Sequence, residues 1–86
     1  MTKISAKIIK NHRTIKSVTY QNVNEYESDK FYEYLVEICH RLDIATPIVI
    51  PYHVKSYDEF NSVRFKKDDF IDAPTFDSLL LENIDR

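Results

Sequence analysis

The sequence predicts an α+β fold: a small, mainly antiparallel sheet with an N-terminal β-hairpin and one main amphipathic helix packed on one face. Three observations predict it. The chain has 86 residues, enough for a single domain spanning residues 1–86. Its first twenty residues alternate in the manner of strands, and residues 31–42 carry apolar side chains at helical spacing. An apolar content of 43% and a net charge of −2 are typical of a chain that folds.

Residues 3–21 indicate two strands joined by a turn. Ile4, Ala6 and Ile8 alternate with polar neighbours, and residues 14–20 are rich in β-branched side chains. Residues 11–13 separate the two runs, and a three-residue loop there would set the register. It would pair Ile4 with Tyr20, Ala6 with Val18, and Ile9 with Ile15. Because the chain has no glycine, Asn11 is the best candidate for a left-handed turn residue.

The strongest periodic signal lies in residues 31–42. The apolar positions recur at spacings of 4, 3 and 4: Phe31, Leu35, Ile38 and Leu42. Ser28 or Asp29 can cap the helix, and Asp43 is its expected end. Glu37 and Arg41 stand in the favourable order for an ion pair. We expect the apolar stripe to dock on a sheet face formed by Ile4, Ala6, Ile8, Val18 and Tyr20.

The second half of the chain contains shorter signals. Pro47 and Pro51 bracket residues 48–50, which suits a short extended piece or a buried connection at an edge. Residues 52–60 fit either a helix or an irregular strand. Residues 63–65 alternate as a strand would, and residues 66–69 resemble a turn. Residues 76–84 allow a helix or a buried strand, and the strand is favoured.

The charges are unevenly distributed. The first twenty residues hold five basic side chains and no acid: Lys3, Lys7, Lys10, Arg13 and Lys16. Residues 68–86 hold six acids against one arginine. In the favoured interpretation the two ends lie side by side and form exposed cross-strand ion pairs. In the other, the basic end faces an anionic partner. Arg64, expected on a strand, has the same two options: an acid of the C-terminal strand or an anionic partner.

Few residues suggest chemistry. Without glycine there is no glycine-rich phosphate loop or nucleophile elbow. Cys39 and His40 are neighbours on the expected helix, so their side chains point about 100° apart and cannot easily share a metal. His12 is expected in the exposed turn, and His53 is the remaining candidate partner for a thiol. Asp68, Asp69 and Asp72 fit a solvated turn better than a calcium loop. We therefore expect no metal, no cofactor and no enzyme.

The expected location is a reducing cytoplasm. One cysteine cannot form an internal disulfide, and no secretory signal opens the chain. The longest aliphatic runs span three residues, whereas a membrane-spanning helix needs about twenty. We expect no membrane insertion.

Residues 60–82 carry three short motifs: Phe60-Asn61-x-x-Arg64-Phe65, Asp69-Phe70-Ile71 and Phe76-Asp77-x-Leu79-x-Leu81-Glu82. They resemble a family of short uncharacterised bacterial proteins of unknown function. Those relatives tend to have Leu-Pro where this chain has Lys66-Lys67. The resemblance implies a stand-alone domain with a strand at residues 78–84, and it implies no activity.

The function expected from these observations is a non-catalytic protein-interaction or structural module. Its partner would be an unidentified protein or a second copy, bound through a sheet edge or an aromatic patch, because eleven aromatic residues exceed what a small core requires. The alternative is binding of a single-stranded nucleic acid through the basic hairpin. The pI of 5.9 argues against it. The residues expected to contact an anionic partner are Lys3, Lys7, Lys10, Arg13, Lys16 and Arg64.

Overall fold

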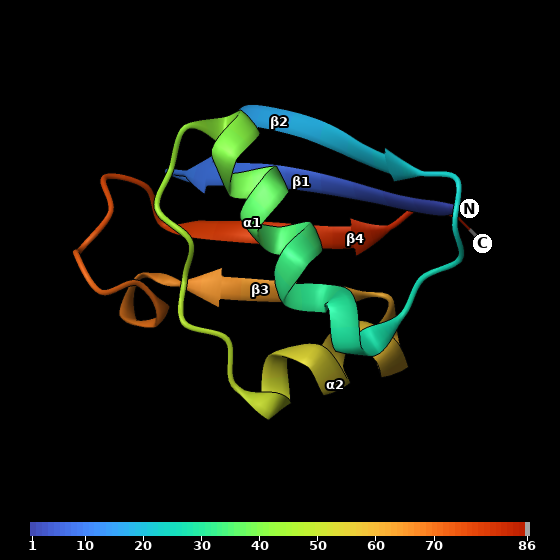
Figure 1. Cartoon of the computed structure of the whole chain (residues 1–86). Helices are drawn as coiled ribbons and strands as arrows, with labels where there is room; N and C mark the ends of the chain where they lie inside the picture. Colours follow the sequence, from blue (N-terminus) through green and yellow to red (C-terminus); the bar gives the residue numbers. More distant parts are fainter. Residues whose placement is uncertain (86) are drawn as a thin grey trace.

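The computed structural model describes residues 1–85, which form one four-stranded antiparallel sheet and two helices (Figure 1). The strands are β1 (Thr2–Lys10), β2 (Arg13–Asn22), β3 (Ser62–Lys66) and β4 (Ser78–Asn83), arranged in the order β2-β1-β4-β3. The helices are α1 (Phe31–Leu42) and α2 (Pro51–Phe60), and the 3-10 turns are η1 (Ser28–Lys30) and η2 (Lys67–Asp69). The predicted α+β fold with an N-terminal hairpin is confirmed. Neither helix combines the length and apolar character needed to cross a bilayer.

Helix α1 lies diagonally across one face of the sheet, and α2 lies beside β3 (Figure 1). The predicted apolar stripe of α1 faces the sheet, with Phe31, Leu35, Ile38 and Leu42 at most 1% exposed. Opposite them, Ile4, Ala6 and Ile8 of β1 are buried, while Val18 and Tyr20 of β2 are half-buried. Burial of each of these large apolar side chains contributes about 1.5–3 kcal/mol, so the stripe is one of the main contributions to the stability of the domain.

The hairpin register is confirmed in its central part and wrong at its turn. Ile4 pairs with Tyr20 and Ala6 with Val18. The loop, however, has two residues, Asn11 and His12, with φ angles of 52° and 64°. This pair of left-handed residues suits the right-handed twist of a two-residue hairpin. The extra residue is Ile15, which enters a β-bulge, so Ile9 pairs with Thr14 and not with Ile15.

Helix α1 begins differently from the prediction. Neither Ser28 nor Asp29 caps it, because η1 precedes it and the N-cap residue is Lys30, which gives no side-chain cap. The Ser28 hydroxyl donates a hydrogen bond to the Asp58 carboxylate of α2 instead. The predicted end at Asp43 is confirmed, with φ of 58° and N–H groups of Asp43 and Ile44 bonded to the last turn. The predicted Glu37–Arg41 ion pair is present at 2.9 Å.

The ambiguous segments of the second half are resolved by packing. Residues 51–60 form α2, which buries His53 and Tyr57. Residues 48–50 form no strand, and their connection is fixed by the Ile48 N–H bonding to the Asp69 carbonyl. The predicted strands over residues 63–65 and 78–84 are confirmed as β3 and β4, and the predicted turn at residues 66–69 contains η2.

Candidate interaction surface

The basic residues of the hairpin do not share one surface. The register places Lys3 and Lys7 of β1 on the face opposite α1, because their neighbours Ile4 and Ile8 point into the core. Lys10 and Arg13 flank the turn. Lys16 pairs with Ile8 on the helix side, and its Nζ donates to the Leu42 carbonyl at 2.7 Å. No continuous cationic track therefore follows the hairpin.

The acidic C-terminal strand lies beside the basic N-terminal strand, as the favoured interpretation of the charge pattern predicted. Strand β4 pairs antiparallel with β1. Lys7 Nζ lies 3.7 Å from Glu82 Oε1, and the N-terminal amine lies 3.9 Å from Asp85. These groups are roughly half exposed, so each pair contributes only a few tenths of a kcal/mol. These ion pairs match the charges of the two neighbouring strands, while packing supplies most of the stability.

Arg64 lies on the predicted strand and on the open face of the sheet, because Val63 and Phe65 point into the core. The expected pairing with an acid of the C-terminal strand is wrong. Its guanidinium donates to the Ser78 hydroxyl of β4 at 3.2 Å, and the residue directly opposite it on β4 is Leu80. The one acid that β4 contributes to this face, Glu82, pairs with Lys7 instead.

Side chains bond to the outer edge of β3 at its two ends. The Asn83 N–H bonds to the Asn61 carbonyl. The backbone N–H and C=O groups of the odd-numbered residues of β3 therefore face β4, and those of the even-numbered residues point away from the sheet. Of these outward groups, the Ser62 carbonyl accepts a hydrogen bond from Ser56 Oγ at 3.0 Å. The Lys66 N–H donates to Asp69 Oδ2 at 2.8 Å. Helix α2 and turn η2 therefore supply partners at both ends of this edge.

The outer edge of β2 is bare. The Ile84 N–H bonds to the Lys3 carbonyl. The backbone N–H and C=O groups of the odd-numbered residues of β1 therefore face β4, and those of its even-numbered residues face β2. The even residues of β1 pair with even residues of β2. The N–H and C=O groups of Ser17, Thr19 and Gln21 consequently point away from the sheet. Within residues 1–85 no hydrogen bond to these groups is found, and Figure 1 shows no element beyond β2.

The bare edge also lacks the usual protection against pairing. Natural sheets guard an edge with charges, proline, bulges or a covering element. Residues 17–22 contain no charged residue and no proline, and the bulge at Ile15 lies before them. The side-chain pattern of the sequence does not single out Ser17, Thr19 and Gln21, because their exposed groups are backbone atoms. The signal that could have found them is this six-residue uncharged run.

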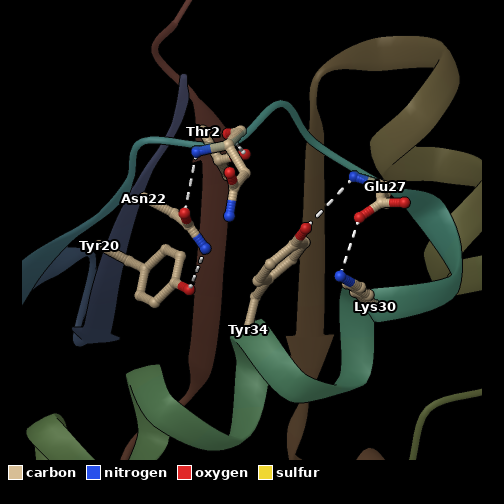
Figure 2. A network of polar contacts seen from close by, with 7 residues as sticks. Thr2, Tyr20, Asn22, Glu27, Lys30 and Tyr34 are labelled. Atoms are coloured by element: carbon tan, nitrogen blue, oxygen red, sulfur yellow. Dashed lines mark hydrogen bonds and ion pairs between the residues drawn. The ribbon is translucent and has the colours of Figure 1, made fainter.

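Polar contacts hold the end of this edge in place (Figure 2). Asn22 Oδ1 accepts the Asn24 N–H at 2.9 Å, and the Asn22 amide lies 3.4 Å from the Tyr20 hydroxyl. Thr2 Oγ1 donates to the Asn24 carbonyl at 2.9 Å. Strand β2 is thus fixed in an extended conformation up to its last residue. Fixing it in advance lowers the entropic cost of pairing with a second strand.

The aromatic residues are mostly internal, so the surplus expected beyond the core is limited to three exposed side chains. Six are buried and two are half-buried: Phe31, Tyr34, Tyr57, Phe65, Phe70 and Phe76, then Tyr20 and Tyr26. Ring centroids 5.3–5.7 Å apart connect Tyr20, Tyr34, Tyr26, Tyr57 and Phe31 along the helix side of the sheet. Three aromatic side chains remain exposed, namely Tyr32, Tyr52 and Phe60. The sheet edge is therefore the better-supported surface.

A surface pocket of about 430 Å³ lies where α2 meets β3, and its lining includes His53, Arg64, Lys66 and Asp69. The His53 ring is 3% exposed. Its Nδ1 accepts the Ile50 N–H at 3.0 Å, and its Nε2 lies 3.4 Å from Asp69 Oδ2. Both ring nitrogens are thus engaged within the fold. This arrangement positions the start of α2 against η2.

The other side chains that could carry chemistry are Cys39, His12, His40 and Tyr26. Cys39 is fully buried, and burial raises the pKa of its thiol to about 11, so it is protonated at neutral pH. His12 is exposed in the turn, as predicted, and His40 is also exposed. The Tyr26 hydroxyl donates to Asp58 at 2.8 Å, and burial, followed by this hydrogen bond, raises the pKa of Tyr26. Among residues 1–85, no three histidine, cysteine or acidic side chains gather in a way that could hold a metal ion.

Comparison with known proteins adds no identification: no protein-family model, curated protein or solved structure matches the chain.

Proposed function

We propose that this chain is a non-catalytic protein-interaction module that binds an extended segment of a partner along the free edge of β2. The observation that carries the proposal is the contrast between the two edges of the sheet. At β3, side chains of α2 and η2 bond to outward backbone groups. At β2, the outward groups of Ser17, Thr19 and Gln21 have no partner within residues 1–85. A partner strand would supply the missing hydrogen bonds, as in other cases of strand addition.

The proposal also places the module in a reducing cytoplasm, because its single cysteine is a buried thiol. Binding of a single-stranded nucleic acid through the hairpin has less support. The basic side chains of the hairpin are divided between both faces of the sheet and the turn, and Lys7 pairs with Glu82.

Two substitutions at one position test the proposal. Thr19→Pro removes the central outward N–H, which the folded domain itself does not use, and proline is tolerated on an edge strand. Thr19→Val keeps this N–H and the extended conformation. The tagged wild-type chain and both variants are used to capture proteins from a native lysate of the source cells, after circular dichroism has established that each variant is folded.

We expect at least one protein to be retained by the wild type and by Thr19→Val, and lost with Thr19→Pro. Hydrogen exchange should show slower exchange of the Ser17, Thr19 and Gln21 amides in the complex. Equal retention by all three chains would place any interaction elsewhere on the surface. Unchanged exchange of these three amides in the complex would likewise overturn the proposal.

A further inference from the structure

The pocket between α2 and β3 contains two basic side chains that no acid neutralises. Arg64 and Lys66 alternate with the buried residues Val63 and Phe65, so both lie on the open face of the sheet, and both line the pocket. Within residues 1–85, neither forms an ion pair. Side chains two positions apart on one strand start about 6–7 Å from each other. One small anion can therefore contact both.

The guanidinium of Arg64 is directed toward Lys66. Its Nη1 donates to the Ser78 hydroxyl at 3.2 Å, and Ser78 is the residue of β4 directly opposite Lys66. The arginine side chain thus leans along the strand toward the lysine, which gathers the two charges at one end of the pocket. A guanidinium carries several N–H groups, so those not bonded to Ser78 remain available to a second acceptor.

The acids near these two cations are engaged by other groups. Asp69 is the one acid of the pocket lining, and its Oδ2 lies 3.4 Å from His53 Nε2 and accepts a backbone N–H of β3. Glu82 of β4 lies 3.7 Å from Lys7 of β1, on the side away from β3. The lining thus holds two basic side chains against one acid, and its net charge is positive.

The rest of the pocket offers an apolar wall. Ile50 and Tyr52, at the start of α2, belong to the lining and are 48% and 68% exposed. Leu80 of β4, which is half-buried, lies directly opposite Arg64. The volume of about 430 Å³ falls within the range of small-molecule sites, about 300–1,000 Å³. A ligand with an apolar ring would cover this wall while its charged end reached β3.

We infer that this pocket binds a small aromatic phosphate monoester, with its phosphate at Arg64 and Lys66 and its ring against Tyr52. A phosphate monoester carries a charge of about −1.5 to −2 at neutral pH and three acceptor oxygens, which suit two cations and a forked guanidinium. A carboxylate carries only one charge. Because the pocket lies at the surface and one acid lines it, the dissociation constant should be about 0.1–1 mM. The site lies at the opposite edge of the sheet from β2 and is independent of any partner bound there.

Titration of the ¹⁵N-labelled chain with phenyl phosphate, followed by NMR at about pH 7.5, tests the site. Saturable shifts are expected for the amides of residues 52–56 and 62–66. Inorganic phosphate should bind at least about threefold more weakly, because it leaves the apolar wall uncovered, and benzoate at least about threefold more weakly, because it has less charge. Shifts that do not saturate, or that are confined to other residues, would overturn the site. Equal affinity for benzoate would overturn phosphate as its ligand.

Substitutions separate this site from a general attraction of anions to the surface. Arg64→Gln should raise the dissociation constant of phenyl phosphate at least about tenfold, and Lys66→Gln at least about threefold. Lys55→Gln on α2 removes the same charge outside the lining and should leave it within about twofold. Equal weakening by all three would overturn the site. Thr19→Pro should also leave the dissociation constant within about twofold, so the site and the proposed function of the β2 edge stand or fall separately.

Discussion

Replacing Asp69 by alanine tests whether its carboxylate holds the β3 edge and the start of α2 together. One oxygen of this side chain accepts the Lys66 N–H at 2.8 Å and lies 3.4 Å from His53 Nε2. Loss of the acceptor for an exposed N–H costs about 1 kcal/mol. The His53 nitrogen, on a ring that is 3% exposed, loses its neighbour at a further cost of about 1–2 kcal/mol. The free energy of unfolding should therefore fall by about 2–3 kcal/mol.

Urea unfolding followed by circular dichroism measures this change, with an unchanged dependence on urea as the sign of a purely thermodynamic effect. For a domain of this size, the loss corresponds to a drop in melting temperature of about 10–20 °C. Asp68→Ala is the matched control, because Asp68 is the adjacent exposed acid and should change the unfolding free energy by less than about 0.5 kcal/mol. Equal effects of the two substitutions would refute the role assigned to Asp69.

Two further predictions concern the turn and the buried thiol. His12→Gly should raise the unfolding free energy by about 0.5 kcal/mol, because φ at His12 is 64° and glycine adopts this angle without strain. The control Lys10→Gly, in the regular strand, should lower the unfolding free energy by about 0.5–1 kcal/mol. A lower unfolding free energy for His12→Gly would contradict the turn geometry. Burial raises the pKa of Cys39 from its ordinary value of 9.0 to about 11, so the unfolded chain binds fewer protons between these values and stability falls as pH rises. From about pH 8 to about pH 10, the wild type should lose roughly 1 kcal/mol more than Cys39→Ala in urea unfolding, and parallel losses would exclude this effect.

The two edges of the sheet also explain why the surface is assigned to β2. Both strands present outward backbone groups, and the difference is made by side chains distant in sequence, Ser56 and Asp69, which bond to β3. A short surface loop or helix of this kind near β2 could have bonded to the outward groups of that edge in the same way. Its absence within residues 1–85 leaves an uncharged strand open to pairing.

Local periodicity was sufficient for the elements with one clear pattern. The 4-3-4 spacing of residues 31–42 predicted α1 and its buried face, because one stripe of a helix repeats at this interval. Alternation predicted β1, β2 and β3, and Asn11 was correctly assigned to the left-handed region. The position of the bulge was not predictable, since residues 14–16 show equally good strand patterns in either register.

The sequence by itself determined the buried stripe of α1 and the core face of β1, because the periods of helix and strand place apolar side chains on one face before any tertiary contact exists. Only the tertiary structure decided the assignment of residues 51–60 to a helix, the hydroxyl partner of Arg64 and the positions of the basic side chains. It also decided that β2 lies at an edge. The physical reason is that strand order and edge exposure depend on pairing between residues far apart in the chain, which no local pattern encodes.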